Sequence, residues 1–492
     1  MSGLRYGEAR GRWVLATAVL GSAMVFVDGT VVNVALPHIG TGLGASLSGL
    51  TWTVNSYTLT LASLILLGGS LGDRFGRKRV FIVGVVWFAL ASLACGLAPN
   101  VEALIAARAL QGVGGALLTP GSLALLQASF RPEDRARAIG AWSGLAGIAG
   151  AVGPFLGGWL VEVASWRWIF LVNLPFAVAV VAMAVRHVPE SLDPTASRHV
   201  DVLGAVSGAV GLGLLTEGLI TWQDHHFASV NVLAPMLLGM AALGAFVLRE
   251  QRADEPMLPL GIFSSRVFSA TNAVTFVVYA ALGGVFFWLV LFLQVAAGFK
   301  PLPAGLALLP MTVLMLLLSA RAGALATRTG PRLPMTVGPL LCAVGVGWLS
   351  QIPRDASYAT DVLPGVLLFG LGLSTTVAPL TATVLAAAPD EHAGLASGVN
   401  NAVARVGGLL AVAALPLVAG LHGEGYARGD QLVGPYRTAM VCCAGLLVIG
   451  AVLSWLFVRE RVPTSGLVCC PVTGPPYETS PRPVVINTGS RG

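Results

Sequence analysis

Charged residues are scarce in this sequence: they make up 11% of its 492 residues, whereas hydrophobic residues make up 55%. The mean hydropathy is +0.80. A soluble chain of this length needs far more charge to cover its surface, so the composition excludes an ordinary soluble protein. Apolar runs long enough to cross a bilayer recur from end to end. The sequence therefore predicts a polytopic membrane protein.

Three chemical signatures are also absent. No Gly-x-x-x-x-Gly-Lys-Ser/Thr motif occurs, which excludes direct use of ATP through a recognisable phosphate loop. The six cysteines have neither disulfide-framework nor metal-ligand spacing, and the adjacent His225 and His226 have no further ligand cluster nearby. We therefore expect no metal site and no cofactor.

Fourteen apolar stretches are spaced along the chain, and each must be helical because open sheet edges cannot cross lipid. They lie near 13–36, 50–71, 80–98, 102–128, 138–160, 167–186, 203–222, 231–249, 268–297, 303–322, 333–352, 362–386, 394–420 and 437–458. The expected fold class is an all-α polytopic membrane protein with fourteen spans.

The net charge of +6 does not indicate a nucleic-acid partner, because the basic residues lie in short segments on alternate sides of the spans. With the N-terminus inside, the inner segments contain Arg74, Arg77, Lys78, Arg79, Arg131, Arg135, Arg137, Arg249, Arg252, Arg266, Arg321, Arg328, Arg332, Arg459 and Arg461. The outer segments contain little beyond Arg167, Lys300, Arg354, Arg428 and Arg437. This alternation predicts a plasma-membrane protein with both termini in the cytoplasm.

The chain repeats itself weakly. The segment 71–78 is echoed at 325–332, and 132–136 is echoed at 389–393, both at an offset of about 255 residues. The echoes predict two six-helix halves with two helices inserted between them. The expected parts are a cytoplasmic N-terminus at 1–12, halves at 13–186 and 268–458, inserted helices at 203–249, and a disordered cytoplasmic tail at 459–492.

Asp28 is the most informative single residue. It lies roughly 15 residues into the first apolar run, close to the middle of a span. A carboxylate at that depth costs about 2.5–3.5 kcal/mol on insertion scales, so it marks a functional site. We expect a protonation site that faces a central cavity; the alternative is an acid that only fixes helix packing.

Two further charges lie within spans. Arg108 belongs to a polar and small-residue stripe in the fourth span, and we expect it to be the partner or electrostatic regulator of the cavity carboxylate. The alternative is a donor to backbone carbonyls. Glu217 in the seventh span is either a second proton site or a wetted acid at the outer mouth.

The segment Gly69–Arg79 is expected to be an inner loop in which glycines permit a tight turn and basic residues face the anionic leaflet. We interpret it as a conformational latch rather than a substrate contact, carried by Gly69, Asp73, Arg74, Gly76 and Arg77.

The fifth span contains a glycine stripe with Gly153, Pro154, Gly157 and Gly158, which indicates a helix-packing seam. The remaining candidates are side chains that line a cavity or serve only in packing: Asn33, Asn55, Tyr57, Gln111, Asn272 and Arg405.

These segments together resemble the fourteen-span drug:proton antiporter family of the major facilitator superfamily. The resemblance rests on Gly69–Arg79, on Leu104–Ala116 with Arg108, and on Gly153–Gly158. It covers about 13–458, and one departure is Thr327 where the first loop copy has Asp73. The resemblance implies export of lipophilic or amphipathic small molecules, driven by proton entry, and it is strongest to the self-resistance exporters of antibiotic producers.

We therefore expect proton-coupled efflux of a lipophilic or amphipathic compound by alternating access, from a monomer in the lipid bilayer. A proton-coupled importer or facilitator of a small metabolite on the same fold is the first alternative. A membrane-embedded lipid-modifying enzyme is the second, although the acids are separated rather than clustered at one depth.

Overall fold

The computed structural model of this chain describes residues 3–192, 201–223, 225–253, 256–388, 393–421 and 423–458. Within these residues, fourteen helices are long and apolar enough to cross a membrane. Each coincides with one of the predicted stretches, so the all-α fold class with fourteen spans is confirmed. The predicted tail at 459–492 lies outside the described residues, as do positions 389–392 of the second sequence echo.

The helices follow one another in a regular order along the chain. The first six spans are α1 (Ala9–Leu43), α2 (Leu47–Phe75), α3 (Arg77–Gly96), α4 (Val101–Ser129), α5 (Pro132–Val163), and α6 (Trp168–Leu171) continued by α7 (Asn173–His187). The next two are α8 (Val202–Thr221) and α9 (Val230–Arg252). After η1 (Leu260–Ser264), the last six are α10 (Arg266–Val295), α11 (Pro301–Leu306) with α12 (Leu309–Thr329), α13 (Arg332–Leu349), η2 (Tyr358–Val362) with α14 (Leu363–Ala386), α15 (Ala393–Val418), and, after η4 (Gly423–Ala427), α16 (Gly429–Phe457).

Several helix starts are fixed by polar caps. Ser46, Asn100 and Ser265 each accept a backbone N–H from the first turn of the helix that follows. Such a cap satisfies a donor that has no partner inside the helix, and this matters more near lipid than in water. The helices therefore begin where short polar residues interrupt the apolar runs.

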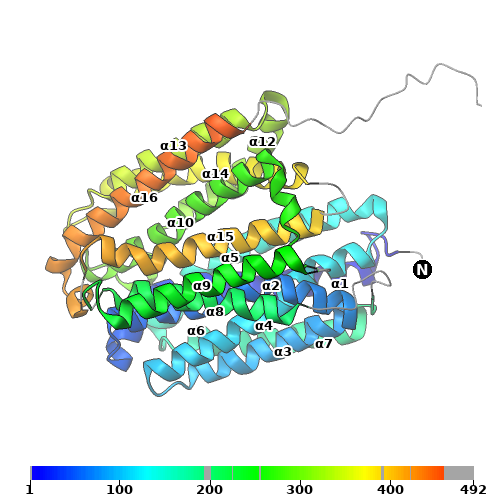
Figure 1. Cartoon of the computed structure of the whole chain (residues 1–492), viewed down its shortest axis with the longest axis horizontal. Coiled ribbons are helices and arrows are strands. Elements are labelled where there is room, and N and C mark those ends of the chain that lie inside the picture. The colour runs from blue at the N-terminus through cyan, green and yellow to red at the C-terminus, as the bar shows by residue number, and fades with distance from the viewer. Residues whose placement is uncertain are drawn as a thin grey trace, which may run out of the picture.

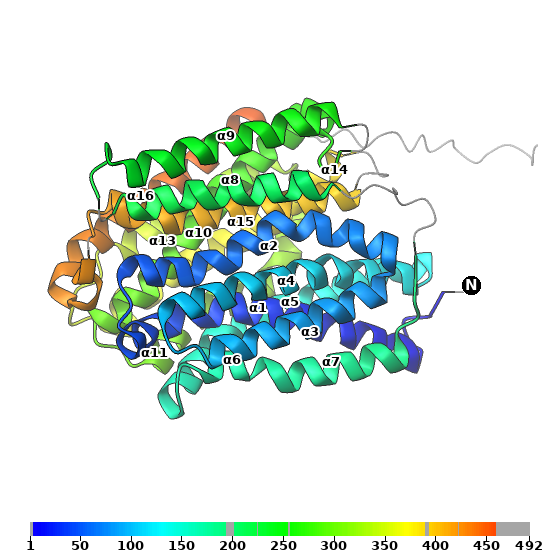
Figure 2. The same cartoon turned by 60° about the horizontal axis from the view of Figure 1, so that its bottom comes forward.

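The two six-helix halves lie against each other along their length (Figure 1). Their contacts include those of α1 with α10 and α11, α2 with α15, and α5 with α11 and α12. The inserted pair α8–α9 packs on the outside, where α8 touches both α2 and α15 (Figure 2). The inserted helices thus cover one of the seams between the halves.

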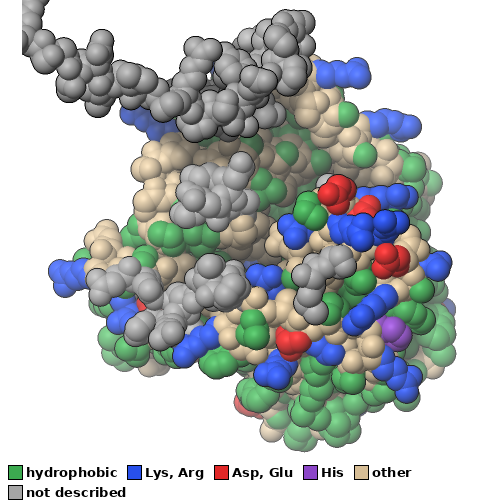
Figure 3. Space-filling model, turned by 90° about the vertical axis from the view of Figure 1, so that its right-hand side faces the viewer, with side chains coloured by type: hydrophobic (Ala, Val, Ile, Leu, Met, Phe, Trp, Pro, Cys, Tyr) green, Lys and Arg blue, Asp and Glu red, His purple; other side chains and the backbone are tan. Residues whose placement is uncertain are grey.

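The two ends of the bundle differ. The end that carries the N-terminus and the segments with Arg74, Lys78 and Arg137, called the basic end below, displays many more Lys and Arg than Asp and Glu (Figure 3). At the opposite, far end, one continuous apolar cluster joins both halves, with Leu36 of α1, Trp288 of α10 and Leu308 before α12 among its members. Towards the basic end each half has its own cluster, one around Phe81 and the other around Phe268. The halves therefore share one apolar cluster at the far end, whereas towards the basic end each half has its own cluster.

Candidate functional site

Asp28 lies in the middle of α1 and is fully buried, with 0% of its surface exposed. Its Oδ2 forms an ion pair with Nη1 of Arg108 on α4. Its Oδ1 accepts hydrogen bonds from Nε2 of Gln111 at 2.8 Å and Nδ2 of Asn173 at 3.3 Å. Three donors from two other helices therefore stabilise the ionised carboxylate inside the first half.

Arg108 has a second set of partners besides the carboxylate. Its Nη1 also donates to Gln111 Oε1 at 2.8 Å, and its Nε donates to the carbonyl oxygen of Thr53 at 3.2 Å. The guanidinium lies 4.2 Å from the centre of the Tyr57 ring. Arg108 thus satisfies both sequence interpretations, since it pairs with an acid and donates to a backbone carbonyl.

Ser92 of α3 and Asn173 of α7 complete the network, although the sequence analysis did not select either as a site residue. Ser92 Oγ accepts from Gln111 Nε2 at 3.2 Å and from Asn173 Nδ2 at 3.1 Å, and it donates to the Phe170 carbonyl at 2.8 Å. The available signal was a lone amide at Asn173 in an otherwise apolar span. The network as a whole connects α1, α2, α3, α4 and α7.

The expectation that Asp28 faces a cavity is wrong for this conformation. The carboxylate is closed off by Arg108 and the two amides, because the polar stripe of α4 turns towards α1 rather than towards the space between the halves. Any exchange of a proton at Asp28 therefore requires that the pair first opens.

An open cleft of about 350 Å³ does lie between the halves at the basic end. Its walls come from α2, α4 and α15, with Leu66, Gly69, Thr119, Gln127, Gly398 and Asn401 among the lining residues. One turn above Asn401, Arg405 is half-buried and donates its Nε–H to Asn401 Oδ1 at 2.8 Å. Arg405 also interacts electrostatically with Tyr57 of α2 and Tyr279 of α10, which places it between the halves.

The other predicted cavity residues divide into two groups. Asn33 is half-buried, like Arg405. Asn55, Tyr57, Gln111 and Asn272 are buried, which favours the packing alternative over the cavity-lining one in this conformation. Gln111 binds Asp28 instead, and Tyr57 donates its hydroxyl to the Val25 carbonyl at 3.3 Å. Both polar atoms of the Asn55 side chain are buried without a hydrogen-bond partner in the described part of the chain.

The expected inner loop Gly69–Arg79 is almost entirely helical. Gly69, Asp73 and Arg74 belong to the last two turns of α2, and only Gly76, with φ of 108°, separates α2 from α3. The loop is shorter than expected because α2 continues through Phe75, and its close approach to α4 is at Gly68, where an added side chain would lie 2.1 Å from the Ala116 carbonyl oxygen. Arg74 lies 5.0 Å over the Phe75 ring.

Three of the five proposed latch residues line the cleft, whereas Arg74 and Gly76 do not. Asp73 and Arg77 form an ion pair at 2.7 Å, and both line the cleft together with Gly69. Glu190, after α7, stabilises the start of α3, because it accepts the Lys78 N–H at 3.1 Å and lies 3.6 Å from Arg79 Nε. The contact of Glu190 could not be predicted from sequence, because 112 residues separate it from Lys78.

The glycine stripe of α5 forms close contacts on two sides. A side chain at Gly153 or Gly157 would collide with Thr30 or Val31 of α1, whereas one at Gly158 would lie 2.5 Å from the Pro301 carbonyl oxygen of α11. The carbonyl of Pro154 similarly approaches Gly305. The stripe is therefore a packing seam, and part of it joins the two halves at the far end.

Glu217 of α8 forms hydrogen bonds with residues outside the Asp28 network. Its Oε2 accepts from Trp52 Nε1 of α2 at 2.9 Å, and its Oε1 accepts from Thr221 Oγ1 at 3.0 Å. On the same helix end, Gln223 Nε2 donates to the Ala413 carbonyl of α15 at 3.0 Å. The end of α8 is thus bonded to both halves.

The fold and this buried pair can now be compared with known proteins. The sequence profile described as Major Facilitator Superfamily matches residues 18–412. This chain belongs to the Major Facilitator Superfamily. The tetracenomycin C resistance and export protein of Streptomyces glaucescens is 37% identical over 82% of this chain and 76% of its own length. The methylenomycin A resistance protein of Bacillus subtilis (strain 168) is 36% identical over 92% of this chain and 96% of its own.

Solved structures agree with this assignment. A bacterial homologue of the human lysosomal transporter Spinster, solved in an inward-facing and occupied conformation, has a TM-score of 0.66 at 14% identity, and the match covers 93% of this chain and 98% of that one. At that identity the likeness concerns the fold alone. The superfamily makes the chain a multi-pass transporter, so the alternative of a lipid-modifying enzyme is set aside.

Proposed function

We propose that this protein exports a lipophilic or amphipathic antibiotic from the cytoplasm in exchange for protons. The proposal places the chain in the cell membrane as a monomer, with the basic end and both termini in the cytoplasm and with no cofactor. The names of its relatives support antibiotic export, and the excess of Lys and Arg at the basic end supports the orientation. The conformation described above is then the inward-facing one.

The observation that carries the proposal is the buried Asp28–Arg108 pair within a molecule whose halves share one apolar cluster at the far end only. An ion pair at this depth is expensive to desolvate and is kept where its charges are used. Because Arg108 retains Gln111 and the Thr53 carbonyl as acceptors, it is not left without partners when Asp28 binds a proton. The pair is therefore suited to opening and closing.

The cycle follows from these contacts. In the outward-facing state, Asp28 is separated from Arg108 and binds a proton from the far side. Neutralisation removes the cost of burying an unpaired carboxylate and favours the change to the inward-facing state. There the proton leaves, the pair forms again, and the substrate enters the cleft between α2, α4 and α15. Glu217 serves as a second acid near the outer end of α2.

The driving force is sufficient for such export. One charge that crosses 100 mV supplies about 2.3 kcal/mol, and a tenfold proton gradient adds about 1.4 kcal/mol. Together they support a concentration ratio of several hundred for a neutral compound per proton. A single coupling carboxylate is therefore enough.

The test uses everted membrane vesicles that contain the full chain. We expect an inside-acid pH gradient to drive accumulation of at least one compound from a panel of tetracenomycin C, methylenomycin A and ethidium. Asp28→Asn abolishes this accumulation but retains downhill exchange of the same compound, whereas Glu217→Gln only slows it. Accumulation that survives collapse of the gradient, or that persists in Asp28→Asn at the normal rate, contradicts the proposal.

A further inference from the structure

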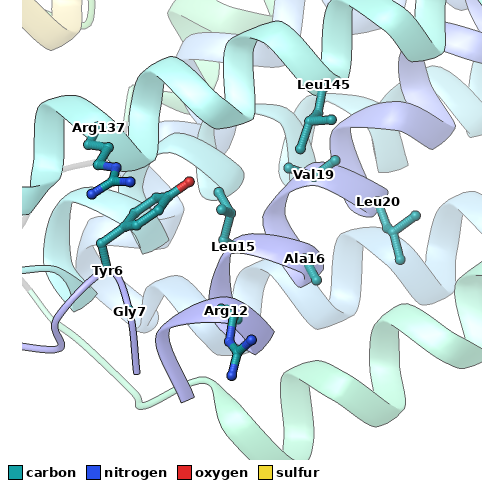
Figure 4. A pocket seen from close by; sticks show the side chains of 9 residues that line it. All are labelled: Tyr6, Gly7, Arg12, Leu15, Ala16, Val19, Leu20, Arg137 and Leu145. Atoms are coloured by element: carbon teal, nitrogen blue, oxygen red, sulfur yellow. The ribbon is translucent and has the colours of Figure 1, made fainter. Parts of the chain in front are cut away.

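A second cavity, of about 710 Å³, lies between the basic-end halves of α1 and α5, away from the transport site. We call it the α1–α5 groove, and Figure 4 shows its lining. It is lined by Tyr6, Gly7, Arg12, Leu15, Ala16, Val19, Leu20, Arg137 and Leu145. It shares no lining residue with the central cleft.

The groove is divided into a charged mouth and an apolar floor. Arg137 and Tyr6 lie together at one end, with the guanidinium 4.3 Å from the ring centre, and Arg12 lines the groove from the first turn of α1 (Figure 4). Val19, Leu20 and Leu145 line the other end. In the described part of the chain neither Arg12 nor Arg137 forms an ion pair, although both line the same groove.

The mouth is held in place by the chain before α1. The Leu4 N–H donates to the Ser129 carbonyl at 2.8 Å, and the Arg131 N–H donates back to the Leu4 carbonyl at 3.2 Å. The Tyr6 N–H donates to Asp134 Oδ2 at 2.9 Å, which fixes the ring that Arg137 covers. The charged mouth is therefore a built feature rather than the end of a free terminus.

The groove opens towards lipid. On the side of the central cleft it is closed by Trp142, which lines that cleft and donates its Nε1–H to Ser22 of α1 at 2.9 Å. On the other side Leu145 continues into a row of exposed apolar side chains one helical turn apart, with Ile148, Val152 and Phe155. A row of this kind on a membrane-spanning helix faces acyl chains.

We propose that the α1–α5 groove binds one anionic phospholipid from the leaflet at the basic end. The lipid phosphate lies between Arg12 and Arg137, and one acyl chain lies along Leu15, Val19 and Leu145. Guanidinium groups bind phosphate with two parallel hydrogen bonds, and the phosphate supplies the ion-pair partner that Arg12 and Arg137 lack in the described part of the chain. Because the lipid contacts both α1, which carries Asp28, and α5, which carries the glycine seam, it stabilises their packing.

The test compares lipids with matched acyl chains on the purified full-length protein by native mass spectrometry. We expect the wild type to retain one phosphatidylglycerol over phosphatidylcholine by roughly thirtyfold, which corresponds to about 1 kcal/mol from each arginine. Phosphatidylglycerol should also raise the melting temperature of the wild type more than phosphatidylcholine does. Equal retention of the two lipids by the wild type overturns the proposal without recourse to any variant.

Three variants locate the lipid. Arg12→Gln/Arg137→Gln loses the preference, whereas Arg252→Gln, an exposed arginine at the basic end of α9, keeps it. Ala16→Trp fills the groove while both arginines remain, and it too loses the bound phosphatidylglycerol. If Ala16→Trp retains it as well as the wild type does, the arginines attract lipid without a groove site and the proposal fails. Displacement of phosphatidylglycerol by methylenomycin A would identify the groove as a drug site and would also refute it.

Discussion

Substitution of Asp28 and substitution of Arg108 should differ in how the stability of the protein depends on pH. Both side chains are at most 2% exposed, so neither charge has water as a substitute partner. Loss of one member of a buried pair costs about 3–5 kcal/mol, because it leaves an uncompensated charge. A buried carboxylate can escape that cost by binding a proton, whereas a guanidinium cannot lose one.

We therefore expect two distinct phenotypes. In Asp28→Asn, Arg108 keeps its charge and falls back on Gln111 and the Thr53 carbonyl, so the stability loss is the same at pH 5 and pH 8. In Arg108→Gln, Asp28 is held only by the amides of Gln111 and Asn173, and its protonation relieves the loss as the pH is lowered. In Asp28→Asn/Arg108→Gln both charges are gone, and the loss is smaller than the sum of the two single losses by about 3 kcal/mol.

The assay is chemical unfolding of the purified protein in mixed micelles at both pH values, followed by tryptophan fluorescence. Ser92→Ala serves as the matched control, since it removes a neutral member of the same network. The reasoning is refuted if the two single losses add up in the double variant. A pH-independent loss in Arg108→Gln would likewise show that the charge of Asp28 is not what Arg108 compensates.

Three further predictions concern other parts of the chain. Gly158→Ala should prevent the contact of α5 with the Pro301 carbonyl and so abolish transport in the vesicle assay. Gly144→Ala is the control and should leave transport unchanged, because no atom lies within 4 Å of the added carbon. Gly76→Ala should lower the melting temperature, because its φ of 108° is unfavourable for alanine and the new carbon would lie 2.8 Å from Glu190 Oε1; an unchanged value would contradict the assigned turn. Partial burial alone would raise the pKa of Asp201, but hydrogen bonds from Arg249 and the Gly204 N–H hold this pKa below the ordinary value of 3.8. The ionised carboxylate therefore stabilises the fold above that pH, and the stabilisation is lost as the pH falls through the lowered pKa. We expect the difference in stability between wild type and Asp201→Asn to shrink in acid.

The number, positions and type of the spans could be predicted from sequence, because a helix that crosses lipid must be both apolar and about 20 residues long. For the same reason Asp28, Arg108 and Glu217 could be recognised one at a time, since each charge contrasts with the apolar run around it. The pairing of Arg108 with Asp28 could also be predicted, but the neutral residues that complete their network could not. Ser92 and Asn173 are small neutral polar residues whose role depends on helix rotation, and periodicity does not determine rotation between helices.

The segment Gly69–Arg79 is predicted to be a loop, whereas most of it is helical in the structure. Its glycines and charges have the composition of a turn, yet α2 continues through Phe75, because glycine in a membrane helix serves close packing more often than flexibility. A side chain at Gly68 would lie 2.1 Å from the Ala116 carbonyl oxygen of α4, and this contact requires a helix at that position. Only Gly76 performs the role that the composition indicated.

The inserted helices constrain how the halves can move. Glu217 is bonded to Trp52 of α2, and Gln223 is bonded to the Ala413 carbonyl of α15, so the same end of α8 holds one residue of each half. Rocking of the halves about the far end would separate these two anchors unless one of them breaks. Besides these two anchors, α8 packs more extensively against α2 than against α15. The geometry therefore favours an α8–α9 pair that stays with α2 and slides along α15, which makes the inserted helices part of the first half during transport.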